Sequence, residues 1–188
     1  APFNVRTRVH EYGGGAWWQH AQTLYFCHFA DQQIYQIDSL AETPEPPRQL
    51  THTPHLRFAD GIVDTRRNRL ICVVEDHSQA PAEPENYLAA VDLSSGSVTP
   101  LSRGHVFFAA PALSPDGTQL AWITWNHPDM PWDGTELWQA AVPDPSNDEY
   151  GLLVVEKIAG SRTEAVQQPR YAANGQLHFI SDRSGWWN

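Results

Sequence analysis

The sequence has few basic residues and no long apolar run. Among its 188 residues, 12 Lys and Arg stand against 22 Asp and Glu, which gives a formal net charge of −10. No segment concentrates the basic residues, and this argues against a nucleic-acid partner. No apolar run approaches the roughly 20 residues that span a bilayer, so no membrane association is expected. The acidic balance mainly favours solubility, with a weaker preference for cationic ligands such as the free amine of a peptide.

Signals for export and for helices are also missing. The first residues, APFNVRTRVHEY, contain no apolar core of a signal peptide, and the missing initiator Met predicts an internal start. No window sustains the apolar spacing of an amphipathic helix, and 15 Pro and 12 Gly interrupt the chain. Short β-branched and aromatic runs bounded by turn residues are abundant. The sequence therefore predicts an all-β fold.

One kind of segment occurs four times. A turn, an apolar strand and a polar loop recur at Leu24, Leu70, Leu120 and Leu177, which are 46, 50 and 57 residues apart. This spacing fits a four-stranded propeller blade, which cannot bury both of its faces alone and must stack on its neighbours. The predicted fold is a β-propeller fragment of about three and a half four-stranded blades, with WD40-like or TolB-like repeats. We expect the blades at residues 8–52, 56–103, 107–160 and, incompletely, 166–188.

Each unit is expected to hold four strands. The first strand is short and rich in small residues, which suits the crowded strand nearest a propeller axis; it is predicted at residues 15–17, 60–63, 110–113 and 169–172. The second strand follows the repeat leucine. The third is predicted at residues 34–37, 87–91 and 137–140, and the fourth at residues 48–51, 97–101 and 153–156. Tight turns are expected at residues 114–117 and 174–175, and solvated loops at residues 41–47, 78–85 and 143–148.

The fourth unit stops at Asn188, where its third strand should begin. Closed propellers have about four to eight complete blades, so we expect a piece of a longer protein. An open arc leaves strand edges unpaired, which favours self-association with a second copy.

The chain has two cysteines, Cys27 and Cys72. Counted from Leu24 and Leu70, they lie three and two positions further on, so they should point to opposite faces of their strands. Such residues are unsuited to a disulfide, and two free thiols favour a reducing cytoplasm.

Five stretches resemble one family of enzymes. They are RVHEYGGGA at residues 8–16, FADQQIY at 29–35, LSPDG from 113 on to Trp122, HPDMPWDGTELW at 127–138 and FISDRSGWWN at 179–188. Together they are similar to the early propeller of bacterial serine peptidases of the prolyl-oligopeptidase family, of the dipeptidyl or acylaminoacyl type. The SPDG turn occurs in many propellers, whereas the segment at 127–138 is specific. Residues 172–175 read AANG where SPDG is usual, which still makes a turn.

The resemblance implies a parent enzyme with two domains. An α/β-hydrolase domain outside this chain would carry the catalytic Ser, Asp and His. The propeller would cap that domain and filter substrates by size. The partners implied are this missing catalytic domain and, in the whole protein, a peptide substrate.

The chain itself lacks the residue patterns of catalysis and of cofactor binding. No serine has the Gly-x-Ser-x-Gly context of a nucleophile elbow, so no catalytic residue is assigned. His52 and His55 form the only close histidine pair and lack a third ligand, and residues 144–149 lack the spacing of a calcium loop. The glycines at 13–15 precede neither a Lys-Ser/Thr pair nor a helix, so they do not form a phosphate loop. We therefore expect no metal and no cofactor.

A candidate substrate-facing group comes from geometry. The loops between the second and third strands, and the connections between blades, should emerge on one face of a propeller. That face would gather Glu11, the Glu75-Asp76-His77 group and the loop from Asp129 to Glu136. From these we take as candidate substrate-facing residues Glu11, Asp76, Asp129, Trp132 and Asp133. A carboxylate suits the ammonium of a peptide because it accepts charge-assisted hydrogen bonds. The favoured alternative is that these carboxylates cap turns or pair with Arg8, Arg57 or Arg183.

Two tryptophans raise the same question of whether their role is functional or structural. Trp132 lies in a loop flanked by proline and would contact a ligand, the missing domain or only its own loop. Trp138 lies on a strand and is expected in the core between blades.

The function expected from these features is that of a non-catalytic propeller part of a cytoplasmic serine peptidase acting on short peptides. Whether the chain counts as an enzyme is left open, because it carries no catalytic residues of its own. One alternative is a stand-alone propeller scaffold that binds protein partners. A further alternative is a periplasmic propeller associated with carbohydrates or lipoproteins.

Overall fold

The computed structural model describes residues 2–38, 45–144, 146 and 151–188. Fourteen strands and one short 3₁₀ turn, η1 (Thr65–Arg67), make up its regular structure, and no α-helix occurs among the residues described. The all-β prediction is therefore confirmed. The predicted loops at 41–47 and 143–148, and the acidic stretch at 144–149, lie partly outside the described residues.

The strands form successive antiparallel sheets, which we call blades. Blade 1 has the order β1 (Trp17–His20), β2 (Thr23–Cys27), β3 (Ile34–Asp38) and β4 (Arg48–Gln49). Blade 2 has the order β5 (Leu56–Asp64), β6 (Arg69–Asp76), β7 (Glu85–Asp92) and β8 (Val98–Ser102). Blade 3 has the order β9 (Phe107–Leu113), β10 (Gln119–Trp125), β11 (Glu136–Ala141) and β12 (Leu153–Gly160). Blade 4 pairs β13 (Val166–Tyr171) with β14 (Leu177–Ser181).

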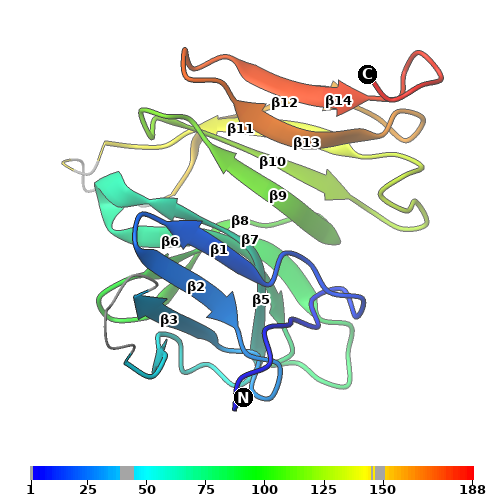
Figure 1. Ribbon diagram of the computed structural model, residues 1–188. Coiled ribbons are helices and arrows are strands. Elements are labelled where there is room, and N and C mark those ends of the chain that lie inside the picture. Colours follow the sequence, from blue (N-terminus) through cyan, green and yellow to red (C-terminus); the bar gives the residue numbers. More distant parts are fainter. Residues whose placement is uncertain (1, 39–44, 145, 147–150) are drawn as a thin grey trace.

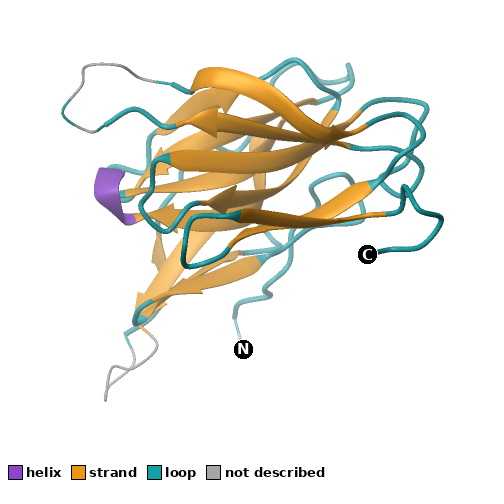
Figure 2. Ribbon diagram, turned by 90° about the horizontal axis from the view of Figure 1, so that it is seen from above, coloured by secondary structure: helices purple, strands orange, loops and turns teal. Residues whose placement is uncertain are grey.

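The blades stack face to face, as Figures 1 and 2 show. The first strands of neighbouring blades lie beside each other, β1 by β5, β5 by β9 and β9 by β13. This is the arrangement of a propeller, with the first strand of each blade innermost, and the fold predicted from the repeat is confirmed. In blade 4, Asn188 exchanges both backbone hydrogen bonds with Ser181, at 3.0 and 3.1 Å, which places it opposite the end of β14.

The inner strands depart from the prediction. β5, β9 and β13 begin three or four residues earlier than expected, whereas β1 begins at Trp17, where the expected strand ended. The cause is a bulge in each longer strand, where Asp60, Ala110 and Gln168 have left-handed φ angles of 52°, 51° and 54°. A bulge inserts an extra residue and lets pairing resume beyond it. The small-residue runs in the sequence begin at the bulge in β5 and β9 and just after it in β13. The residues that precede each bulge were therefore not predicted as strand.

The hydrophobic core is divided between the blades. β6 shows how: Leu70, Cys72 and Val74 pack toward blade 1, whereas Ile71 and Val73 pack toward blade 3. Alternate residues of a strand point to opposite faces, so one fully buried strand supplies two cores. A third core joins blades 3 and 4 and includes Ile123 and Val166. Each buried Leu, Ile or Val contributes about 1.5–3 kcal/mol relative to exposure.

The two cysteines lie in the same core, between blades 1 and 2. Cys27 and Cys72 were predicted to point to opposite faces of their strands, but this does not place them in different cores. The face of blade 1 that carries Cys27 packs against the face of blade 2 that carries Cys72. Both remain free thiols, as expected, and the Cys27 Sγ–H donates to the Phe58 carbonyl at 3.1 Å. Burial is the largest cause that raises the pKa of both thiols.

We expect neither thiol to react in the folded protein. Both side chains are inaccessible to solvent, and a raised pKa keeps them protonated, whereas the thiolate is the reactive form. Titration with a chromogenic thiol reagent at pH 8 should give no reaction before unfolding and reaction of both thiols in guanidinium chloride. Rapid modification of the native protein would contradict the buried placement.

Candidate functional site

The connections that carry most predicted site residues emerge on one side of the arc. They comprise the turn at residues 8–13, the loops 77–84, 126–135 and 182–188, and the links 103–106 and 161–165 between blades. We call this side the loop face; it is on the right in Figure 1, where β10 and β14 end. Hydrogen bonds join neighbouring parts of it, such as that from the Thr135 amide to the Glu164 carbonyl at 3.2 Å.

Three of the candidate carboxylates have partners within the chain. Asp76 Oδ1 accepts from the Ser78 amide at 2.8 Å, and Asp133 Oδ2 accepts from the Met130 amide at 3.0 Å. Asp129 pairs with Arg162, at 3.0 Å between Oδ2 and Nε. These contacts are the turn caps and ion pairs of the favoured alternative. Asp129 pairs with Arg162 and not with Arg8, Arg57 or Arg183, whereas Glu75 of the same group pairs with Arg57, at 2.9 Å between Oε1 and Nη1. Their first role is therefore to shape the loops.

Glu11 is different, because no ion pair to it forms among the described residues. Its side chain is exposed on a turn closed by the bond from the Gly13 amide to the Val9 carbonyl at 2.9 Å. His10 and Glu11 both have left-handed φ angles, 56° and 64°. Such a conformation costs roughly 1–2 kcal/mol for each residue, and strain of this kind gathers at functional sites.

The aromatic residues divide as the sequence suggested. Trp138 is partly buried against the core between blades 2 and 3, and its Nε1–H donates to Thr124 Oγ1 at 3.0 Å. Trp132 is 62% exposed and Tyr12 is 63% exposed, both on the loop face. Packing within the Trp132 loop therefore leaves most of this side chain uncovered and available for a further contact.

His10 fixes the turn at residues 8–13 against blade 3. Its ring meets Phe107 and Trp125 edge-on, with centroids 5.2 and 5.4 Å away. Burial lowers the pKa of His10 from its usual value, while the charges of Glu75 and Asp60 oppose this shift. The neutral imidazole is thus favoured in the folded protein.

The lowered pKa predicts a loss of stability on acidification. In the unfolded chain His10 takes up a proton as the pH falls through about 6.5, but in the folded chain only at lower pH. The unfolded state then binds more protons, so the free energy of unfolding declines from about pH 7.5 to pH 5. Urea unfolding at both pH values should show a smaller decline for His10→Asn, since Asn tolerates the left-handed backbone. An equal decline in both proteins would contradict this role.

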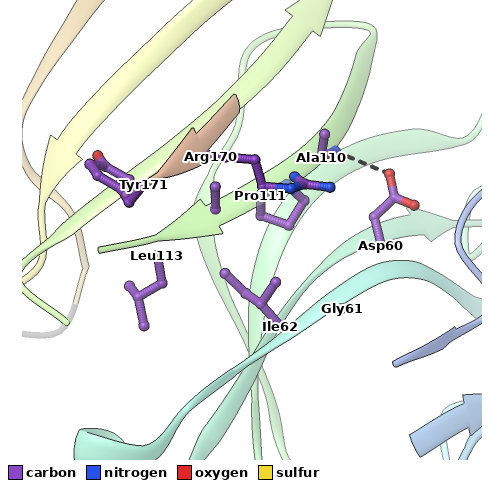
Figure 3. Close-up of a pocket in the computed structure, with 9 residues that line it drawn as sticks. Asp60, Gly61, Ile62, Ala110, Pro111, Leu113, Arg170 and Tyr171 are labelled. Atoms are coloured by element: carbon purple, nitrogen blue, oxygen red, sulfur yellow. Dashed lines mark hydrogen bonds between the residues drawn. The ribbon is translucent and has the colours of Figure 1, made fainter. Parts of the chain in front are cut away.

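Asp60 joins β5 to β9 and to the segment just before β1, a role that was not predicted from the sequence. Its Oδ1 accepts from the Gly15 amide at 2.6 Å and its Oδ2 from the Ala110 amide at 3.0 Å, while its own amide donates to the Gly15 carbonyl at 2.9 Å. Figure 3 shows the bond to Ala110. Beside it, along the propeller axis, lies a hollow of about 380 Å³. The hollow is lined by Asp60, Ile62, Pro111, Leu113, Arg170 and Tyr171, among others. An aspartate inside a strand is uncommon, and this was the one signal available.

Among the described residues, no group of three or more His, Cys, Asp or Glu side chains could hold a metal ion. His52 and His55 are both exposed. No helix in the described part is long and apolar enough to cross a membrane.

The stacked four-stranded blades and the axial hollow define an open arc of a β-propeller. Over its whole length the chain matches puromycin hydrolase, with 37% identity and a TM-score of 0.87. It also matches a puromycin-hydrolysing peptidase of Mycobacterium tuberculosis, with 36% identity and a TM-score of 0.82. The chain is therefore similar over its whole length to a propeller segment of peptidases of the prolyl-oligopeptidase family, which confirms the resemblance predicted from the sequence. It spans about 30% of the length of each of these two proteins.

More distant structures share the fold alone. TolB from Acinetobacter baumannii matches 88% of the chain with 17% identity and a TM-score of 0.54. The Dos1 propeller matches 85% of the chain with 11% identity and a TM-score of 0.51. No protein-family model and no curated protein matches the sequence.

Proposed function

We propose that the chain is the non-catalytic propeller part of a serine peptidase that acts on short peptides or aminoacyl amides. It would cap an α/β-hydrolase domain and restrict access to it. The observation that carries this proposal is the match along the whole chain to about 30% of two puromycin-hydrolysing proteins, together with the absence of a Gly-x-Ser-x-Gly elbow from the sequence. A third matched structure is a serine-to-alanine variant of puromycin hydrolase complexed with PGG, which fits a serine nucleophile in that relative.

The loop face is the surface we assign to the catalytic domain. Large exposed side chains gather there, namely Tyr12, Met130, Trp132, Trp186 and Trp187. Exposed aromatic residues of this kind are typical anchors of protein interfaces. With the loop face covered, substrate would reach the catalytic groups only through gaps at its rim or along the axis, which supports selection by size. Two buried free thiols support a cytoplasmic location.

The experiment that tests the proposal uses the whole protein encoded by the reading frame of this chain. We expect a Gly-x-Ser-x-Gly motif outside the present segment, followed by Asp and His. The whole protein should hydrolyse puromycin and chromogenic aminoacyl amides, and a serine-to-alanine change in the motif should abolish this. The 188-residue chain alone should be inactive. Absence of the motif, or activity that survives loss of its serine, would overturn the proposal.

Within this proposal, Glu11 is the residue we assign to the substrate's free amine. Puromycin and short peptides present an ammonium group, and Glu11 offers an exposed carboxylate without an ion pair on the loop face. In the whole protein, Glu11→Gln should raise KM for a substrate with a free amine roughly tenfold to a hundredfold, because a hydrogen bond to a charged group contributes about 1.5–3 kcal/mol. Asp133→Asn, which changes a carboxylate engaged within its own loop, is the matched control and should have a smaller effect. An unchanged KM in Glu11→Gln would exclude this role.

A further inference from the structure

One carboxylate of the Glu75-Asp76-His77 group, which was expected to face the substrate, is instead buried beneath the loop face. Glu75, near the end of β6, is only 2% exposed. Its Oε2 accepts from the His10 amide at 2.7 Å. Its Oε1 lies 2.9 Å from Arg57 Nη1 and 2.6 Å from His77 Nε2. Both oxygens of this buried group are therefore engaged.

Burial of a carboxylate is costly, so these partners matter. An ionised group removed from water must be compensated by charge and by hydrogen bonds. Two routes lead from Glu75 to the turn at residues 8–13. The first is its direct bond to His10. The second passes through Arg57, whose Nη1 also donates to the Arg8 carbonyl at 3.4 Å. The buried carboxylate thus holds the turn from blade 2.

The turn needs such support, because His10 and Glu11 adopt left-handed φ angles in succession. Strained residues of this kind persist only where the surroundings determine them fully. On the blade 3 side, Phe107 and Trp125 confine the His10 ring. On the blade 2 side, Glu75 fixes the His10 amide. The backbone just before Glu11 is therefore held from both sides, while the Glu11 side chain remains exposed.

We propose that Glu75 is a positioning residue for Glu11: it holds the turn so that the Glu11 carboxylate is placed to receive the ammonium group of the substrate. The substrate in this assignment depends on the proposed function. The geometry depends only on the contacts of Glu75. Glu75 itself is buried and does not touch the substrate.

The first part of the proposal, that Glu75 holds the turn, is tested without an activity assay. The measurement is hydrogen exchange of backbone amides in the 188-residue protein. Glu75→Gln retains one acceptor oxygen but cannot serve both the His10 amide and Arg57. We expect the His10 and Glu11 amides to exchange at least tenfold faster, with the β6 amides unchanged. Glu156→Gln, on exposed β12, is the control and should leave the turn unaffected. Unchanged exchange in the turn would overturn the assignment.

A second variant covers the case in which Glu75→Gln fails to fold. Glu75→Asp keeps the negative charge for Arg57 and His77 but is one methylene shorter, which draws its oxygens away from the His10 amide. Faster exchange confined to the turn is again expected. Unfolding of Glu75→Gln together with an unchanged turn in Glu75→Asp would overturn the assignment.

The second part of the proposal, that Glu75 acts on substrate binding through Glu11, is tested by a double-mutant cycle in the whole peptidase. Glu75→Gln should raise KM for a free-amine substrate about tenfold, with kcat changed less than twofold. In a Glu11→Gln background the same substitution should change KM less than twofold, because Glu75 acts through Glu11. Additive effects on KM would indicate a merely structural role and overturn the assignment.

The exchange and kinetic experiments together distinguish failure of the Glu75 assignment from failure of the proposed function. Faster exchange in the turn with an unchanged KM would overturn the role of Glu75 toward the substrate, even in an active peptidase. An inactive whole protein would count against the proposed function. The exchange measurement would then still decide whether Glu75 holds the turn.

Discussion

Asp60→Ala is expected to lower the free energy of unfolding by about 3 kcal/mol. The substitution leaves the Gly15 and Ala110 amides without their acceptor, and each hydrogen bond to a charged group contributes about 1.5–3 kcal/mol. Alanine must also adopt the left-handed backbone of residue 60, where φ is 52°, which aspartate tolerates better. Because these bonds join β5 of blade 2 to the segment just before β1 and to β9 of blade 3, their loss weakens two blade contacts together.

Asp60→Asn is the matched comparison. Asparagine keeps the shape, tolerates the left-handed backbone and retains one acceptor oxygen, so about half of the loss should remain. Urea unfolding followed by tryptophan fluorescence measures both variants. Equal stability of Asp60→Ala and the wild type would mean that solvent replaces these bonds at no cost.

Gly96→Ala is expected to have a comparable effect, of about 3 kcal/mol or more. Gly96 lies in the turn between β7 and β8, and a Cβ there would stand 1.9 Å from the Leu50 carbonyl oxygen. The neighbouring atom belongs to the backbone of blade 1 and cannot rotate away. Overpacking of this kind costs about 1–3 kcal/mol. The left-handed φ of 73° adds roughly 1–2 kcal/mol more for a residue with a side chain.

Gly175→Ala separates these two contributions. Gly175 has a similar φ of 82°, but nothing lies within 4 Å of the place where its Cβ would be. Its substitution should cost only the conformational part, roughly 1–2 kcal/mol. Thermal or urea unfolding of the two variants side by side gives the difference. Equal losses would show that the two blades move apart without cost at Gly96.

The second strand of every blade could be predicted because it carries the densest apolar run. β6 and β10 are buried along nearly their whole length, and the run itself reveals the strand. The inner strands were harder to predict, because the bulges at Asp60, Ala110 and Gln168 depend on pairing with the next strand. A left-handed residue leaves no pattern in the sequence unless it is glycine, asparagine or aspartate, and Ala110 and Gln168 are none of these.

The position of the candidate site could be predicted, but its internal contacts could not. Order along the chain sufficed to place Glu11, Asp129 and Trp132 on one face, since the connections of a propeller alternate between its two ends. The pairing of Asp129 with Arg162, 33 residues away, depends on how adjacent loops fold together. Asp60 escaped notice for a similar reason, because its partner Gly15 lies 45 residues away in the sequence. Glu75 was expected on this face, but its burial and its bond to the His10 amide, 65 residues away, could not be predicted.

The shared cores between blades also bear on how the chain folds as it is synthesised. The first core combines Trp18 and Ile34 of blade 1 with residues of blade 2 as late as Val91. The sheet of residues 17–49 therefore cannot cover its apolar face until some 40 further residues have left the ribosome. At about 5–20 residues per second this takes several seconds, during which the first blade is exposed to chaperones and to aggregation. Each later blade covers the one before it and repeats the same delay. Each blade therefore completes its folding only after the next blade has been synthesised.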